Sequence, residues 1–195
     1  MDFVTIDFEA SCLPRHGASF PIELGVSGAQ GTRSWLIRPH EAWRDWDWTQ
    51  EAFDLHGITR AQLDAEGLAP ADVLAQAVEA IGTARVIADS RIDAQWWATL
   101  SAAAPGVIAA PTVLVEHVDG IFDDIGATHQ QIMEAQHHAD LLCPQRHRAG
   151  ADALWLRLLL DRLMEVRVAE QAPLWVEADG VVVAPAVVRG GGLFV

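Results

Sequence analysis

Four carboxylates and one histidine in this chain are of the types that act together on a phosphate ester. Asp7 and Glu9 are separated by one residue, and Asp93 stands far along the chain. His147 precedes Asp152 by five positions. Hard cations such as Mg²⁺ take oxygen ligands, and a pair of them can activate a water and stabilise a leaving oxygen. Because an unperturbed histidine has a pKa of about 6.5, it is suited to accept the proton of that water. The residue types therefore indicate metal-assisted phosphodiester hydrolysis.

The first two acids end the stretch around which the chain is organised, residues 3–8. This run is too short for a helix and is rich in β-branched and aromatic residues, so it predicts a strand. Alternate side chains of a strand point to the same side, which puts Asp7 and Glu9 on one face. Two like charges there repel unless a cation lies between them. The pair alone is also explained by a strand that ends at residue 8 with both acids in solvent.

The third acid follows a short apolar run, residues 85–88, which fits a central parallel strand. Carboxylates at the C-terminal end of such a strand stand where α/β sheets bind ligands. Both Asp89 and Asp93 are candidates. We prefer Asp93, because it follows the apolar Ile92 and opens a helix predicted over residues 94–104.

The fourth acid, Asp152, opens an apolar helix predicted over residues 153–168. The helix dipole favours a negative charge in the first turn, which explains Asp152 without any function, and His147 can equally be an ordinary loop histidine. The other predicted elements are strands at 20–27, 32–38 and 107–115, helices at 60–66, 70–82 and 129–138, a short helix ended by Gly57, and a hairpin around 179–180.

Composition narrows the class of protein. With 195 residues, 51% of them apolar, the chain fits one domain with a substantial core. Its formal charge of −14 argues against a protein that holds long duplexes by neutralising phosphates. We expect neither a membrane span nor a secretory signal, because no long apolar run and no basic N-terminal region are present. Two cysteines without metal-ligand spacing favour free thiols and a cytoplasmic location.

With these four acids and the histidine in this order, the sequence resembles the DEDDh 3'-5' exonucleases. This is the family of ribonuclease T, oligoribonuclease and the proofreading subunits of bacterial DNA polymerase. The family's Asp-x-Glu at the end of the first strand is matched within residues 6–11. Its second motif, an Asp that opens a helix after the fourth strand, is matched by Ile92-Asp93, and its third, His followed five positions later by Asp, by residues 147–153. A stretch like residues 55–59 is also common in the family. The agreement in order and interval covers roughly residues 3–165.

The resemblance implies an α/β exonuclease domain over residues 1–170, of the ribonuclease-H-like fold, with a mixed five-stranded sheet flanked by helices. Residues 171–195 would form a C-terminal extension with a hairpin and a flexible tail. The implied activity is a two-metal 3'-5' exonuclease that hydrolyses short single-stranded DNA or RNA to 5'-mononucleotides, with two divalent cations, Mg²⁺ or Mn²⁺. Relatives are often dimers, and the apolar residues 174–187 would suit a homodimer interface.

The resemblance also assigns roles to the site residues. Asp7 would bridge both ions, Glu9 and Asp152 would complete the ion on the nucleophile side, and Asp93 would act directly or through water. His147 would deprotonate the attacking water. Contacts to the terminal nucleotide are expected from the following residues: Phe8, Ala10, Ser11 and His56.

The chain departs from the family's pattern near the second motif. Many members have His-Asn before the acid, whereas residues 89–93 read Asp-Ser-Arg-Ile-Asp. The absence of Asn and Lys removes usual contacts to sugar and phosphate. Two alternative functions are an exonuclease-fold binding module without turnover and a phosphodiesterase for small nucleotides.

Overall fold

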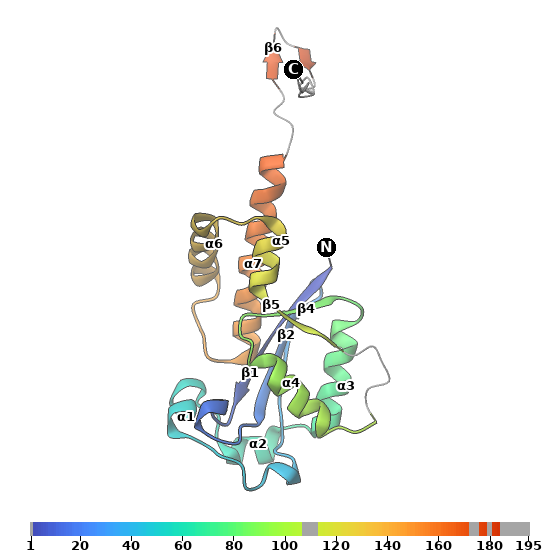
Figure 1. Cartoon of the computed structure of the whole chain (residues 1–195), viewed down its shortest axis with the longest axis vertical. Helices are drawn as coiled ribbons and strands as arrows, with labels where there is room; N and C mark the ends of the chain where they lie inside the picture. Colours follow the sequence, from blue (N-terminus) through green and yellow to red (C-terminus); the bar gives the residue numbers. More distant parts are fainter. Residues whose placement is uncertain (1, 107–112, 172–175, 179–180, 184–195) are drawn as a thin grey trace, which may run out of the picture.

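The fold is built on a mixed five-stranded sheet, as the family resemblance predicts (Figure 1). The order of its strands is β3-β2-β1-β4-β5. The computed structural model describes residues 2–106, 113–171, 176–178 and 181–183. Three strands form an antiparallel meander: β1 (Phe3–Ala10), β2 (Pro21–Gly28) and β3 (Gly31–Leu36). Two further strands, β4 (Arg85–Ala88) and β5 (Val115–His117), lie parallel to β1.

Helices occupy most of the remaining described chain, and three of them begin at a threonine N-cap, two of which, Thr59 and Thr128, the sequence predicts. Thr49, Thr59 and Thr128 each accept a hydrogen bond from the first turn of the following helix through their side chains. The helices are α1 (Gln50–His56), α2 (Arg60–Glu66), α3 (Pro70–Ile81), α4 (Asp93–Ala102), α5 (Val118–Ile125), α6 (His129–Leu142) and α7 (Ala149–Gln171). Two short 3₁₀ helices, η1 (Pro14–His16) and η2 (Glu41–Trp43), lie in the connections.

Different helices cover the two faces of the sheet. The side chain of Phe8 packs in a core shared with α3 and α4. Residues of α5, α6 and α7 form the core on the other face, where Thr5 Oγ1 donates a hydrogen bond to the carbonyl oxygen of Ala153 in α7. Because alternate side chains of a strand point to opposite faces, Asp7 and Glu9 lie on the same face as Thr5 and point toward α7.

Several element boundaries differ from prediction, three of them near the predicted site or in the sheet. β1 continues to Ala10, so Glu9 lies within the strand, because Glu9 and Ala10 still pair with Glu23 and Pro21 of β2. The strand predicted at 107–115 is wrong at positions 113 and 114, which are not in a strand, and its positions 107–112 lie outside the described residues. α7 begins at Ala149, one turn before the predicted start.

At the C-terminal end, β6 (Val176–Ala178) and β7 (Val181–Val183) pair antiparallel. They flank the predicted hairpin turn at 179–180, which, like the predicted tail at 190–192, lies outside the described residues. Within the part of the chain that the structure describes, no helix has the length and apolar character needed to cross a membrane.

Candidate metal and nucleotide site

Acidic side chains from β1, α4, α7 and the residue that follows β4 meet beside the C-terminal half of β1. Carboxylate oxygens of Asp7, Glu9 and Asp152 all lie within 4.8 Å of one another. The same holds for oxygens of Asp7, Asp89 and Asp93. The structure therefore brings together all four predicted acids, with Asp7 shared by both groups. It also adds Asp89, so the two candidates for the second-motif acid both reach Asp7.

The fourth acid reaches β1 because the start of α7 lies directly against β2. Gly25 of β2 pairs with Asp7 of β1, and a Cβ atom at Gly25 would stand only 2.0 Å from the carbonyl oxygen of Ala149. Only glycine leaves room for the helix at this point, since real Cβ contacts are never so short. The close approach places Asp152, in the first turn of α7, beside the acids of β1.

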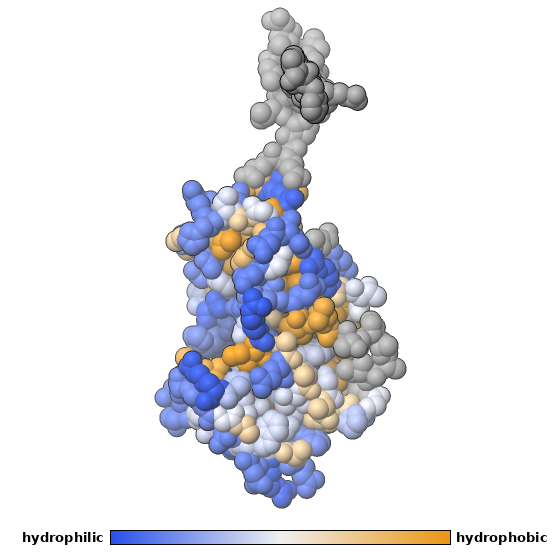
Figure 2. Space-filling view, in the orientation of Figure 1, coloured by the Kyte–Doolittle hydropathy of each residue, from blue (hydrophilic) through white to orange (hydrophobic). Residues whose placement is uncertain are grey.

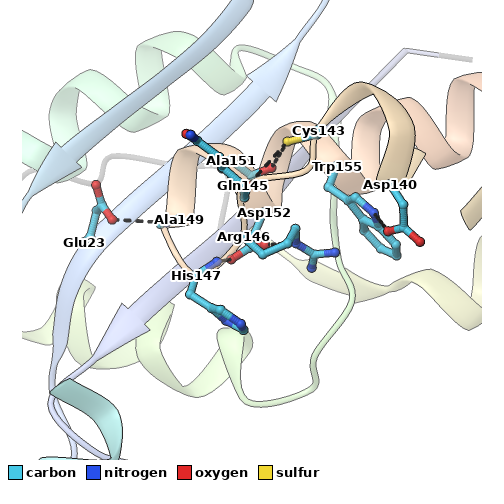
Figure 3. Close-up of polar contacts among 10 residues, drawn as sticks. All are labelled: Glu23, Asp140, Cys143, Gln145, Arg146, His147, Ala149, Ala151, Asp152 and Trp155. Atoms are coloured by element: carbon cyan, nitrogen blue, oxygen red, sulfur yellow. Dashed lines mark hydrogen bonds and ion pairs between the residues drawn. The ribbon is translucent and has the colours of Figure 1, made fainter. Parts of the chain in front are cut away.

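A buried ion pair fastens the same helix start to the sheet. Glu23 of β2 is 2% exposed, and its carboxylate accepts hydrogen bonds from Arg148 Nε at 2.9 Å and Nη2 at 2.7 Å. The backbone N–H of Ala149 donates a further hydrogen bond at 3.1 Å (Figure 3). From the sequence, Glu23 reads only as an interruption of an apolar strand, because its partner lies 125 positions away.

Burial, followed by repulsion from neighbouring acids, shifts the protonation of the two acids of β1. Burial raises the pKa of Asp7 well above its usual value, and repulsion from Asp93, Glu9 and Asp152 raises it further. Burial, together with repulsion from Asp152 and Glu23, raises the pKa of Glu9 to about 8. Without a compensating cation, such a cluster holds protons at neutral pH.

The buried carboxylate of Asp93 shows that the site fits a cation. Its side chain is 1% exposed, and neither carboxylate oxygen has a hydrogen-bond partner among the residues that the structure describes. Burial, followed by repulsion from Asp89, raises the pKa of Asp93 to about 8. The backbone of Phe8 and of Ser90 is near enough to lower this pKa, but it does not reach the carboxylate oxygens with hydrogen-bond geometry. An unpartnered buried carboxylate costs several kcal/mol unless it is neutralised or coordinates a metal. The donor set, all oxygen, is that preferred by Mg²⁺ and Mn²⁺.

The backbone of His147, rather than its imidazole ring, contacts the acidic cluster. Its N–H donates a hydrogen bond to Asp152 Oδ2 at 2.8 Å, while the exposed imidazole extends away from that carboxylate (Figure 3). Among the described residues, His147 is the only non-glycine residue with a positive φ, 67°. Such a conformation costs on the order of 1–3 kcal/mol and is often kept at functional sites.

Arg146 supplies positive charge at the cluster and is a residue that sequence reasoning missed. Its Nε donates to Asp152 Oδ1, and its guanidinium carbon lies 4.1 Å from the ring centre of Trp155. Trp155 is fixed in turn by a 2.8 Å hydrogen bond from Nε1 to Asp140 Oδ1 (Figure 3). The only sequence signal was an arginine immediately before the predicted histidine.

A pocket of about 100 Å³ adjoins the acids at the end of β1. Phe8, Glu9 and Ala10 line it together with Leu55 and His56 of α1, and apolar surface adjoins α1 in the space-filling view (Figure 2). Leu55 is 57% exposed, which leaves an apolar side chain free to contact a base. Burial lowers the pKa of His56 to about 4, and its Nδ1 accepts the N–H of Ile58 at 2.9 Å.

The structure does not bring Ser11, the remaining predicted contact, to this pocket. Its side chain is fully buried, and its Oγ accepts a hydrogen bond from the N–H of Phe20 at 3.1 Å. Its carbonyl oxygen accepts a hydrogen bond from the N–H of Thr49. Ser11 therefore joins the end of β1 to neighbouring segments.

The raised pKa values predict how metal-free stability depends on pH. Glu9 and Asp93 have pKa values of about 8 in the fold and roughly 4 when unfolded, so the folded state binds more protons between these limits. The stability that these two groups contribute to the fold is therefore fully present below about pH 4 and is lost as pH rises through 8.

In chelator, Asp93→Asn should raise the Tm more at pH 8.5 than at pH 5.5, as measured by thermal unfolding. The control Glu79→Gln, an exposed acid of α3, should shift Tm equally at both pH values. Equal shifts for Asp93→Asn would contradict the protonation described here.

Comparison with solved structures finds 3'-exonucleases. The nuclease domain of 3'hExo, a DEDDh family member bound to rAMP, matches with a TM-score of 0.58 and 18% identity, over 84% of this chain and 92% of that one. Escherichia coli exonuclease I in complex with a dA16 oligonucleotide matches with a TM-score of 0.61 and 12% identity, over 86% of this chain and 41% of that one. A full-length 3'-exonuclease matches with a TM-score of 0.58 and 15% identity, over 96% of this chain and 67% of that one. No protein-family model and no curated protein sequence matches the chain.

At these identities the comparisons establish the fold. The shared architecture is the mixed five-stranded sheet flanked by helices, with the acids of β1, α4 and α7 grouped beside Asp7 in this chain. The chain therefore has the ribonuclease-H-like fold of the DEDDh 3'-5' exonucleases, the family that its sequence motifs resemble.

Proposed function

We propose that this protein is a metal-dependent 3'-5' exonuclease that hydrolyses short single-stranded DNA or RNA to 5'-mononucleotides. The observation that carries the proposal is the convergence of four carboxylates on Asp7, in two groups that share it, with His147 beside them, in an exonuclease fold. A pair of divalent cations bound there would activate a water and neutralise charge on the scissile phosphate.

Each residue then has a distinct task. Asp7 would bind both cations, with Glu9 and Asp152 on one side and Asp93 on the other. The exposed His147 would turn toward the attacking water and accept its proton. The pocket at the end of β1 would hold the terminal nucleotide against Leu55, next to Glu9.

The charge of the chain favours a short substrate. At −14 the protein offers little long-range attraction to a polyanion, so affinity must come from contacts close to the cations. The same observation keeps a second candidate, a phosphodiesterase for small nucleotides. Comparing rates on dinucleotides and on 20-mers separates the two, since a phosphodiesterase of that kind would cleave only the former.

The direct test is digestion of a 5'-labelled single-stranded oligonucleotide in Mn²⁺. We expect progressive shortening from the 3' end, lost in chelator, and a rate lower by 10²- to 10⁴-fold in His147→Ala if His147 is the base. Because Ala is strained at a positive φ, His147→Asn is the better-matched variant, since Asn tolerates that conformation. His137→Ala, at an exposed position on α6, is the control and should retain full activity. Unshortened substrate with the unmodified protein would refute the proposal.

A further inference from the structure

Asp89 stands outside the four-acid pattern that the sequence predicts, yet it shares the site. It follows the last residue of β4, and its carboxylate lies within 4.8 Å of oxygens from Asp7 and Asp93. Asp93 contributes two buried oxygens without hydrogen-bond partners among the described residues. Asp89 therefore lies close to two carboxylates that repel it unless a cation is bound between them. One of the two, Asp93, needs a positive partner.

We propose that Asp89 is a fifth carboxylate ligand of the site, which holds the second divalent cation together with Asp7 and Asp93. The inference rests on the proposed function, because it concerns the same pair of ions. Affinity for hard cations rises with the number of charged oxygen ligands. With Asp89, the second cation has three carboxylates available, as many as the first has in Asp7, Glu9 and Asp152.

The charge of the neighbourhood agrees with a fifth acid. Five carboxylates carry one negative charge more than two divalent cations neutralise. Arg146 supplies the missing positive charge, since it pairs with Asp152 and also attracts Asp89. Asp89 is also exposed, so it can change its orientation to meet a cation without disturbing the core.

Mn²⁺ titration of the full chain by calorimetry tests the inference without relying on activity. Asp89→Asn should leave one Mn²⁺ binding event unchanged and weaken the other by about 10- to 100-fold, a range found for residues that tune metal sites. Asp89→Glu should recover much of the affinity, because it restores the carboxylate. Asp119→Asn is the matched control: this acid of α5 pairs with Arg91 and His117 and does not belong to either group.

The outcomes separate the inference from the function. Two Mn²⁺ events in Asp89→Asn with unchanged affinities would overturn the role of Asp89 and leave the exonuclease proposal standing. Absence of any Mn²⁺ event in the unmodified chain would overturn both. Because Asp89 is exposed, Asp89→Asn should fold, and its Tm in chelator should equal or exceed that of the unmodified protein as a like charge is removed.

Discussion

Asp7→Asn should lower the rate of 3'-terminal cleavage by about 10⁴-fold or more and, at the same time, raise the Tm of the metal-free protein. Asp7 is the one acid common to both groups, so its loss weakens both cation positions, each worth several kcal/mol of transition-state stabilisation. The gain in stability follows from the raised pKa of Asp7, since burial and four neighbouring acids oppose its charge. The amide keeps the shape of the side chain and removes that charge.

The opposite signs make this prediction specific. A residue that merely supports the fold would lose activity and stability together. The measurements are single-turnover cleavage of a labelled oligonucleotide in Mn²⁺ and thermal unfolding in chelator at pH 8. Glu79→Gln, which removes one exposed charge that belongs to neither acidic group, should change neither by a comparable amount. Cleavage by Asp7→Asn within tenfold of the normal rate would contradict the role given to Asp7.

Glu23→Ala should lower the free energy of unfolding by about 3 kcal/mol, the largest effect on stability that we expect. Breaking a buried ion pair typically costs 3–5 kcal/mol, because the remaining charge loses its partner. Here the lower end applies, since the Arg148 side chain is 47% exposed and can recover water. The backbone N–H of Ala149 also loses its acceptor.

Urea unfolding measures this effect, and the chain provides a matched control. Arg162 and Glu165 form an exposed ion pair on α7, with side chains 45% and 68% exposed, so Glu165→Ala should cost no more than about 1 kcal/mol. A Glu23→Ala variant that loses no more stability than Glu165→Ala would show that the buried pair does not hold α7 to the sheet.

Local patterns explain why much of the fold was predictable. The apolar run of β1, the N-caps Thr59 and Thr128, and the start of α4 at Asp93 each follow from residues close in sequence. The four candidate metal ligands follow from the order of the family's motifs, and the structure places those four acids together. Cytoplasmic location and self-association stay predictions.

What could not be predicted depends on distant partners. The end of β1 is set by pairing with β2, and Glu23 is explained only by Arg148, 125 positions later. The second-motif acid was framed as a choice between Asp89 and Asp93, because sequence spacing does not reveal that the end of β4 and the start of α4 place both carboxylates near Asp7.

The central claim, that these carboxylates bind a pair of divalent cations, is tested most directly by crystals of the protein soaked in Mn²⁺ and a mononucleotide. Anomalous diffraction should show two peaks that both lie within coordination distance of Asp7. One peak should contact Glu9 and Asp152, and the other Asp93 with Asp89. Nucleotide density should occupy the pocket beside Leu55. Crystals that bind Mn²⁺ only elsewhere, with no peak at Asp7, would contradict the claim.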